Sequence, residues 1–587
     1  MYLKQTKNNK GRIYLSFVHG YRDHEGKSRS KTVEKIGYLD EFLHIYDDPI
    51  AHFKKIAKEK TNEEVTELTI KNIHSKTINY DVSSQKNLGY VILKKMFQEL
   101  QLDLLLKEKQ KKIKASFNIN SIMQLLVYSR ILFPGSKKET FENKETFFEN
   151  FNFSLKDLYR SLDVFSNIKN DIEKELWFNT KDKYNRDVST TYYDCTNYYF
   201  EISNNDEDLI DENGNILEKG YRKKGYSKEN RKSPIIQMGL LMDNTGCPLS
   251  YDIFPGNESE KTSLRPAIKE GKAKFNLDRV VVVSDRALNT SDNTVFIAGK
   301  NNNYTETDGY IFGQTVRGAD KEFKRWVLNK NGYIKDDITD KEGNSIKFIH
   351  KSRVFAKTTK IDRNGKRNNK FDIYQKQMVY YSKKYADKQK RERNILINKA
   401  KDLISNPGKY TKATAYGAAA YINDINFDKN TGEIINNSVL SLNNAKIKEE
   451  EKYDGYYAIV TSELEMSDKE IRDKYKNLWE IEETFKITKS SLKTRPVYVW
   501  TKEHIEAHFL VCFIALVLLR LLEKDLKEQY SSEKIINSLK KYTSTKVEHD
   551  VYLQNFRDKI ISKLENIYNV DLSKKYLTLS KIRQILK

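Results

Sequence analysis

Four consecutive valines followed by a serine and an aspartate, Val280 to Asp285, constrain the fold of this chain most. A short run of β-branched residues is typical of a strand that is buried on both faces. Such strands belong to α/β folds, in which helices cover both faces of the sheet. A carboxylate directly after the strand lies where an open α/β sheet places its functional site. The run therefore predicts an α/β fold with Asp285 as a candidate site residue, and an ordinary turn cap is the alternative.

The composition describes a large and basic protein. The chain has 587 residues, of which 38% are hydrophobic, so it can bury sizeable cores. Its formal net charge of +22 favours a polyanionic partner such as nucleic acid. Plain solubility and an AT-rich coding sequence would produce a similar excess, so the charge alone names no chemistry.

The cysteines and the apolar runs predict the compartment. Cys195, Cys247 and Cys512 provide neither a disulfide framework nor a metal-binding pair, and this indicates a reduced, cytoplasmic protein. The N-terminus has no apolar stretch of the kind found in signal peptides. The longest apolar run, Phe509 to Leu519, is much shorter than the roughly 20 residues that span a bilayer. We expect a buried core helix there and no membrane partner.

Changes in the spacing of apolar residues divide the chain into six regions. The first alternates like a small antiparallel sheet, with a turn at residues 22–26 and a helix around residues 41–59. The predicted regions are 1–80, a β unit plus a helix; 81–185, helical; 186–299, the first part of an α/β core; 300–450, a β-rich insertion with a basic helix; 451–525, the rest of the core; and 526–587, a helical tail.

Asp194 lies in the middle of a predicted strand rich in tyrosine and threonine, residues 190–200. An acidic side chain among apolar neighbours is costly to bury unless it is paired or binds a metal. The alternative is an edge strand that turns the carboxylate to water. The apolar residues on both sides favour a functional role for Asp194.

A third candidate carboxylate, Glu482, lies on a predicted helix. Tyr475, Glu482 and Lys489 are spaced seven apart, so they share one helix face. An adjacent apolar stripe would anchor the helix to a core. An ordinary amphipathic helix with solvated Glu and Lys side chains explains the spacing equally well.

Taken together, these residues bear a family resemblance. Tyr475, Glu482 and Lys489, preceded by Asp194 and Asp285, resemble the DDE transposases of bacterial insertion sequences. The similarity is to the group with the signature Tyr-x2-Arg-x3-Glu-x6-Lys and a β-rich insertion before the last acidic residue. Further stretches that look similar are 11–15, 35–40, 251–257 with Thr262, 285–289, 454–460, 492–498 and 502–508.

The resemblance implies a ribonuclease-H-like catalytic core, interrupted by the insertion, with an N-terminal β/helical DNA-binding region and a helical C-terminal tail. It assigns DNA binding to region 81–185 as well. Asp194, Asp285 and Glu482 would be the catalytic residues and would hold two divalent cations, Mg²⁺ with Mn²⁺ as a substitute. Mg²⁺ prefers oxygen ligands, and two ions about 3.5–4 Å apart suit an in-line phosphodiester displacement.

The resemblance also implies contacts with DNA. Tyr475 and Lys489 would touch phosphate near the scissile bond, and Arg286 and Arg495 would do the same. Trp326, in the insertion, would stack on an unpaired base, whereas packing in the core of the insertion is the alternative. The arginine of the family signature is replaced here by Leu478. Its contact is then absent or comes from another residue such as Lys476 or Arg472.

The function implied is that of an insertion-sequence transposase. It would bind the terminal inverted repeats of its element and catalyse metal-dependent strand cleavage and strand transfer. Its partners would be double-stranded DNA, both element ends and target, and a second copy in a homodimeric synaptic complex, with no nucleotide cofactor. The alternatives are an inactive or domesticated DNA-binding relative and a metal-dependent nuclease on the same core. We expect the protein to be cytoplasmic and associated with the nucleoid through DNA.

Two histidines form a second pattern that is typical of metal sites. His504 and His508 are four residues apart and could bind zinc on one helix face. No third ligand follows at a suitable spacing, so the sequence favours packing or phosphate contact for both.

Overall fold

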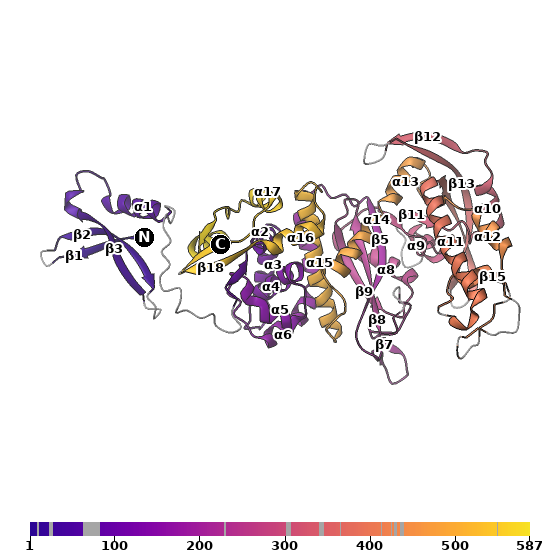
Figure 1. The fold of residues 1–587 in the computed structure, drawn as a ribbon, viewed down its shortest axis with the longest axis horizontal. Helices are drawn as coiled ribbons and strands as arrows, with labels where there is room; N and C mark the ends of the chain where they lie inside the picture. Colours follow the sequence, from indigo (N-terminus) through magenta and orange to yellow (C-terminus); the bar gives the residue numbers. More distant parts are fainter. Residues whose placement is uncertain are drawn as a thin grey trace. The chain divides into compact units, whose positions relative to one another are not determined.

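The computed structural model describes two compact units, Met1–Val82 and Ser83–Lys587 (Figure 1). The residues outside the description are 9–10, 23–27, 63–82, 228–230, 301–306, 340–344, 364–365, 413, 424, 428–430, 432, 435–439 and 549. Most of the turn that the sequence predicts at residues 22–26 therefore lies outside the described residues.

The first unit contains a three-stranded antiparallel sheet and one helix. The strands, in the order β1-β2-β3, are β1 (Tyr2–Lys7), β2 (Ile13–Arg22) and β3 (Ser28–Tyr38). Helix α1 (Pro49–Asn62) begins later than the predicted helix around residues 41–59. The reason is local, because Asp48 accepts a hydrogen bond from the Ala51 amide (2.9 Å) and Pro49 occupies the first helical position.

A nine-stranded mixed sheet dominates the second unit, which makes the fold a mixed α/β architecture. The order of its strands is β12-β13-β14-β17-β11-β10-β5-β8-β9. They are β5 (Thr190–Tyr199), β8 (Ile235–Asp243), β9 (Pro248–Pro255), β10 (Val281–Ser284), β11 (Gly309–Gln314), β12 (Ile334–Thr339), β13 (Ser345–Arg363), β14 (Lys366–Tyr381) and β17 (Tyr456–Thr461).

Five neighbouring strands have a distinctive pattern of directions. The consecutive strands β5, β8 and β9 pair antiparallel. The next two strands along the chain, β10 and β11, lie on the other side of β5 and run parallel to it. The valine run thus becomes a central strand, β10, whose described residues are all buried.

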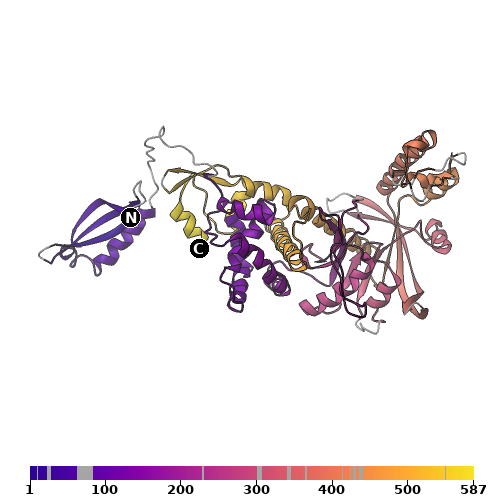
Figure 2. The same cartoon turned by 90° about the horizontal axis from the view of Figure 1, so that it is seen from below.

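Helices cover both faces of these five strands. On one face lie α8 (Glu260–Phe275) and α9 (Ser291–Ile297). On the other lie α13 (Asp468–Lys476), α14 (Trp479–Lys486) and α15 (Lys502–Asp525). Helix α15 is long and apolar enough to cross a membrane, but most of it is buried here. It lies between the strands and a group of N-terminal helices (Figures 1 and 2), so the prediction of a core helix at residues 509–519 is confirmed.

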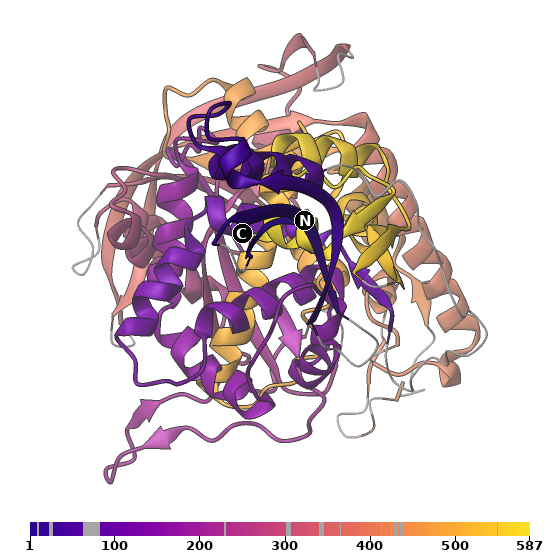
Figure 3. The same ribbon diagram turned by 90° about the vertical axis from the view of Figure 1, so that its left-hand side faces the viewer.

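That group of helices comes from residues 90–180. It consists of α2 (Tyr90–Glu99), α3 (Leu102–Lys111), α4 (Ile119–Leu132), α5 (Lys137–Glu142), α6 (Leu155–Asn167) and α7 (Lys169–Thr180). Between β5 and β8, the short hairpin of β6 (Leu209–Ile210) and β7 (Ile216–Glu218) projects from the second unit (Figure 3).

The long segment between β11 and β17 extends the same sheet. Strands β12, β13 and β14 continue it beyond β17. The helices of this segment are α10 (Lys321–Leu328), α11 (Lys383–Ser405) and α12 (Asn444–Glu451), and β15 (Ile422–Asn423) pairs with β16 (Ser441–Leu442). The described residues of this segment are thus rich in strands and include the basic helix α11.

The prediction of a helical C-terminal tail is wrong in part. Helices α16 (Ser532–Lys541), α17 (Lys559–Ile567) and α18 (Leu579–Leu586) alternate with strands β18 (Thr543–Glu548), β19 (Val551–Gln554) and β20 (Tyr576–Thr578). These strands form a sheet with β4 (Gln85–Asn87), in the order β20-β19-β18-β4. The local helical spacing does not reveal this sheet, because β4 pairs with β18 from more than 450 residues away.

Candidate active site

Two of the predicted carboxylates lie on or next to neighbouring parallel strands, Asp194 within β5 and Asp285 directly after β10. Val283 of β10 pairs with Tyr192 of β5, a difference of 283 − 192 = 91 in residue number. Continuing this register by two residues places Asp285 beside Asp194, since 285 − 194 is also 91. Side chains two residues apart along a strand share a face, and both Val283 and Tyr192 belong to the core beneath α14 and α15. Asp194 therefore belongs to that face of β5, and Asp285 would continue the same row directly beyond the end of β10.

The structure excludes an edge-strand position for Asp194, whereas Asp285 does cap a turn. Strand β5 has neighbours on both sides, so Asp194 is not on an edge strand. Its side chain is half-buried, and its carboxylate accepts a hydrogen bond from the Cys195 amide at 2.7 Å. Asp285, also half-buried, accepts one from the Ala287 amide at 2.8 Å. Asp285 thus caps a turn and still lies at the end of the central strand.

The helix that carries the third carboxylate is interrupted twice. Tyr475 lies in α13, Glu482 lies in α14, and Lys489 lies in a π-helical turn, Ile487–Ser491. At the first break the Leu478 amide bonds to the Tyr475 carbonyl, three residues back, instead of four. The prediction of one regular helix over residues 475–489 is therefore wrong, because the backbone tightens at Leu478 and loosens at Ile487.

Side-chain contacts nevertheless fasten this segment to the strand that carries Asp194. The Tyr192 hydroxyl donates to the Lys474 carbonyl at 3.0 Å, at one end of the segment. At the other end, the hydroxyls of Tyr198 and Thr488 are 2.7 Å apart. Asp194 lies between the two tyrosines on β5.

Two further residues complete this arrangement. The Lys489 ammonium donates to the Thr196 hydroxyl at 2.5 Å. Thr196 is two residues beyond Asp194, on the same face of β5. Glu482 lies between Lys474 and Thr488 in sequence, and its side chain is exposed. The segment thus lies across the face of β5 that carries Asp194, with Glu482 in its middle.

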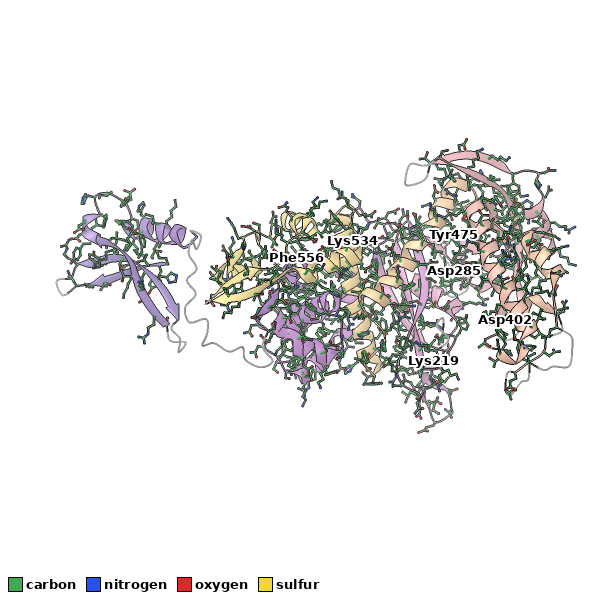
Figure 4. All side chains as sticks on the ribbon, viewed as in Figure 1. Lys219, Asp285, Asp402, Tyr475, Lys534 and Phe556 are labelled. Carbon is green, nitrogen blue, oxygen red and sulfur yellow. The ribbon has the colours of Figure 1, made fainter. Side chains whose placement is uncertain are left out.

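Tyr475 links this helical segment to Asp285 (Figure 4). Burial raises the pKa of the Tyr475 hydroxyl, and the negative charge of Asp285 raises it further, while Arg286 opposes this shift and Glu482 adds a smaller rise. The neutral phenol therefore lies within electrostatic reach of both carboxylates. A cavity of about 330 Å³ opens at this point, and its wall includes Asp285, Arg286 and Tyr475.

The donor set suits an oxygen-liganded divalent cation, although the site is not closed. Among the described residues, no three His, Cys, Asp or Glu side chains are grouped closely enough to hold a metal. Within the described residues, neither Asp285 nor Glu482 forms an ion pair with a cationic side chain. Both carboxylates are thus available to a cation, and an exposed Glu482 can adjust its rotamer without disturbing the core.

The other predicted DNA contacts are dispersed. Arg286 is exposed beside Asp285. Arg495 lines a different cavity, of about 500 Å³, with Arg130 and Lys137. Trp326 packs in a small cluster of the segment between β11 and β17, where the guanidinium carbon of Arg353 lies 4.5 Å from its ring centroid. Trp326 thus packs within its own segment, which is the alternative to stacking on a base.

The position of the missing family arginine is part of the core. Leu478 is buried against Ile481 and Phe485, so a charged side chain at this position would lose its hydration. Of the two substitutes that the sequence offers, Arg472 pairs with Asp473 at 2.8 Å. Lys476 is exposed and forms no ion pair within the described residues.

The paired histidines pack instead of forming a metal site among the described residues. The imidazole of His508 is buried, and its Nε2 lies 3.1 Å from the Thr494 carbonyl oxygen. Nε2 of His504 lies 3.3 Å from the Asp163 carboxylate. His508 is thus packed in the core, which is one of the two roles, packing or phosphate contact, that the sequence favours.

Sequence reasoning missed one residue that shapes the site, Gly313. The register of β10 with β11 pairs Val283 with Ile311, so its continuation places Gly313 beside Asp285. A Cβ atom at Gly313 would lie 2.4 Å from the Tyr475 hydroxyl. A glycine inside a strand pattern indicates a close approach of another group, and this signal was present in the sequence.

Comparison with known proteins shows a similarity in the N-terminal part of the chain. Residues 3–69 match the family described as IS1634 family transposase, N-terminal domain. No curated protein matches the chain.

Two solved structures show a remote similarity. A piggyBac transposase synaptic complex with hairpin DNA is 8% identical, with a TM-score of 0.34 and coverage of 82% of this chain and 80% of that one. A Mos1 transposase paired-end complex with the left transposon end is 10% identical, with a TM-score of 0.11 and coverage of 42% and 67%. Residues 3–69 of this chain are thus similar to the N-terminal domain of the IS1634 family transposases.

Proposed function

We propose that this protein is a DDE transposase that cleaves and transfers DNA strands at the ends of its own insertion sequence. The observation that carries the proposal is the parallel register of β5 with β10, whose continuation would bring Asp194 and Asp285 to one level. The helical segment that holds Glu482 is fastened across the same strand, β5. The N-terminal match to IS1634 family transposases supports it independently.

The strand order supports the finer fold assignment. Three consecutive antiparallel strands, β5, β8 and β9, followed by two strands parallel to the first, in the order β9-β8-β5-β10-β11, are what a ribonuclease-H-like core requires. We assign β5, β8, β9, β10 and β11 to that core. The segment between β11 and β17 is then the insertion that precedes the last catalytic carboxylate.

In this proposal Asp194, Asp285 and Glu482 hold two Mg²⁺ ions, for which Mn²⁺ substitutes. Bound there, the ions would supply Lewis-acid activation of the attacking oxygen and charge neutralisation at the leaving oxygen. The protein itself positions the carboxylates, and Tyr475 lies beside Asp285 in the wall of the cavity. Lys489, held by Thr196, places a point charge beside the strand where a DNA phosphate would pass.

The surrounding cations would align the DNA. Arg286, next to Asp285 in the sequence, and Lys476, next to Tyr475, are exposed. The excess of basic residues gives the whole chain a net charge of +22. Such charges attract a phosphate backbone and release its counterions. The partners proposed are the terminal inverted repeats and a target duplex, bound by a homodimer that pairs two ends in the cytoplasm.

The test is a cleavage assay on duplexes that carry the inverted repeats flanking the coding sequence. Wild-type protein with Mg²⁺ or Mn²⁺ is expected to nick the repeat end, and protein with EDTA is expected to bind without nicking. Binding that is specific for the repeats, with no cleavage in either metal, would instead favour the inactive DNA-binding relative. Cleavage of any duplex irrespective of the repeats would favour a nuclease.

A further inference from the structure

A second cavity of the large unit is lined by cations from two distant segments of the chain. Its volume is about 500 Å³, and it lies between the α4–α5 connection and residues 493–499. The charged side chains in its wall are Arg130, Lys137, Lys493, Arg495 and one acid, Glu139. The formal charge is 4 − 1 = +3 when all five are ionised, so this wall repels cations and attracts anions.

Lys137 is the most unusual of these residues. It is only 4% exposed, and no described side chain or carbonyl accepts a hydrogen bond from its ammonium. Burial of an ammonium without a hydrogen-bond partner or a countercharge is unfavourable. Accordingly, burial and the nearby Arg130 lower the pKa of Lys137 to about 7. A ligand that supplies negative charge would remove this penalty.

The neighbouring groups are fixed and do not neutralise Lys137. Arg130 is buried and donates to the carbonyls of Leu492 (3.2 Å) and Gly135 (3.1 Å), neither of which carries a charge. The Glu139 carboxylate accepts from the Ser136 amide at 3.3 Å as part of the α5 cap. Burial and the positive charges of Lys137 and Arg130 hold the pKa of His508 well below its usual range, so His508 is neutral.

We propose that this cavity binds a tetrahedral oxyanion, and that the oxyanion is a backbone phosphate of the DNA on which the site at Asp194 and Asp285 acts. The assignment of the oxyanion to DNA rests on the proposed function, whereas the anion site itself does not. Lys137 and Arg130 are the buried cations of its wall, Arg495 is half-buried, and Lys493 is exposed.

The position and accessibility of the cavity favour DNA as the source. The Val497 amide donates to the Tyr199 carbonyl at 3.1 Å, which ties the cavity wall to β5 five residues beyond Asp194. That distance is about 16 Å along a strand, or about five nucleotide steps of duplex DNA. The rim residues Lys493 and Tyr498 are exposed, so a backbone phosphate can enter without the cavity opening.

The experiment compares two neighbouring lysines in the full-length protein. Lys137→Met removes the buried ammonium, and Lys138→Met removes an exposed one from the same helix, where Lys138 pairs with Glu142. The first measurement is the rise in melting temperature caused by millimolar sulfate. The second is the affinity for a duplex that carries the flanking inverted repeat.

We expect sulfate to stabilise the wild type and Lys138→Met but not Lys137→Met. We also expect Lys137→Met to lower DNA affinity by about tenfold, the value of one charge-assisted contact, with little change in Lys138→Met. Equal sulfate responses in all three proteins would overturn the anion site. A lost sulfate response with unchanged DNA affinity would overturn DNA as the source and leave a free anion as the ligand.

A second variant tests the proposal in case Lys137→Met does not fold. Lys493 is exposed and has a left-handed φ of 43°, a conformation that asparagine tolerates. Lys493→Asn therefore keeps the backbone, and it should weaken both the sulfate response and DNA binding. Unchanged values for both would contradict the proposal. Because the sulfate response needs no cleavage, a protein that binds sulfate but never nicks DNA would refute the proposed function alone.

Discussion

The hydroxyl of Tyr475 occupies the space above Gly313 that a side chain would otherwise fill. A Cβ atom at Gly313 would come within 2.4 Å of that hydroxyl and 3.1 Å of the Arg286 backbone nitrogen. Gly313 continues the row of Asp194 and Asp285 across the sheet. The absence of a side chain on one strand thus sets how closely the helical segment with Glu482 approaches the two aspartates.

Gly313→Ala should therefore impair catalysis more than DNA binding. The added methyl group displaces Tyr475 and with it the segment that carries Glu482, and a misplacement of about 1 Å can cost about 10²-fold in rate. The cleavage rate on the repeat duplex, measured beside its dissociation constant, checks this. Gly408→Ala is the matched control, since a Cβ atom there meets nothing within 4 Å. A Gly313→Ala protein that cleaves like wild type would show that the close approach is dispensable.

Replacement of either aspartate by asparagine should abolish cleavage and preserve binding. Asp194→Asn and Asp285→Asn keep the shape of the side chain but remove the charge that a divalent cation requires. The loss of several kcal/mol of transition-state stabilisation corresponds to at least about 10³-fold in rate. Single-turnover nicking with Mg²⁺ and a gel-shift assay separate the two properties.

Asp292→Asn is the control for these variants. Asp292 is exposed in the first turn of α9, seven residues beyond Asp285, and its loss should leave nicking unchanged. Full activity in Asp285→Asn would rule out the assignment of the central strand end as the active site.

We expect the loss of the buried ion pair between Arg186 and Asp243 to lower the free energy of unfolding strongly. Arg186 Nε lies 2.5 Å from the Asp243 carboxylate, and both side chains are almost inaccessible. Asp243→Ala leaves the guanidinium charged and buried, and breaking such a pair costs about 3–5 kcal/mol. Urea unfolding measures this loss. Glu108→Ala, which removes an exposed pair with Lys112, is expected to change nothing measurable.

The double replacement Arg186→Met with Asp243→Leu distinguishes two causes of that loss. If the cost comes from the stranded charge, the apolar pair should recover most of the stability. If it comes from the hydrogen bonds that Asp243 accepts from Thr245 and Cys247, the double variant should remain as unstable as Asp243→Ala.

Lys137 should make the stability of the protein rise with pH above neutrality. Its pKa is about 7 in the folded protein and 10.5 in an ordinary environment. Between these values the unfolded chain binds a proton that the folded chain does not, so the free energy of unfolding increases with pH. Below about pH 7 both states are protonated, and the burial penalty is present in full.

The difference between wild type and Lys137→Met isolates this contribution. The side chains that face Lys137 across the cavity, Arg130, Lys493, Arg495, Glu139 and His508, are the same in both proteins. Relative to the variant, wild type should gain stability as the pH rises from about 7 towards 10. Urea midpoints at several pH values test the sign. A constant difference across that range would mean that Lys137 keeps its ordinary pKa.

The local sequence was sufficient for the features that depend on side-chain pattern alone. The valine run predicted a doubly covered strand, and β10 is buried on both faces. The apolar run at residues 509–519 predicted a core helix, and α15 is one. Asp194 and Asp285 were recognisable because a carboxylate at or inside a buried strand needs a reason to be there.

Tertiary structure alone decided where these strands lie relative to one another. Whether Asp194 and Asp285 share a level depends on the pairing of β5 with β10 across about 90 residues, and no local pattern encodes that register. The break in the helix lies at Leu478, a buried core residue. The pairing of β4 with β18, and the meeting of Lys137 with Arg495, likewise join segments hundreds of residues apart. Long-range pairing is set by the total burial of the fold, so only the folded chain reveals it.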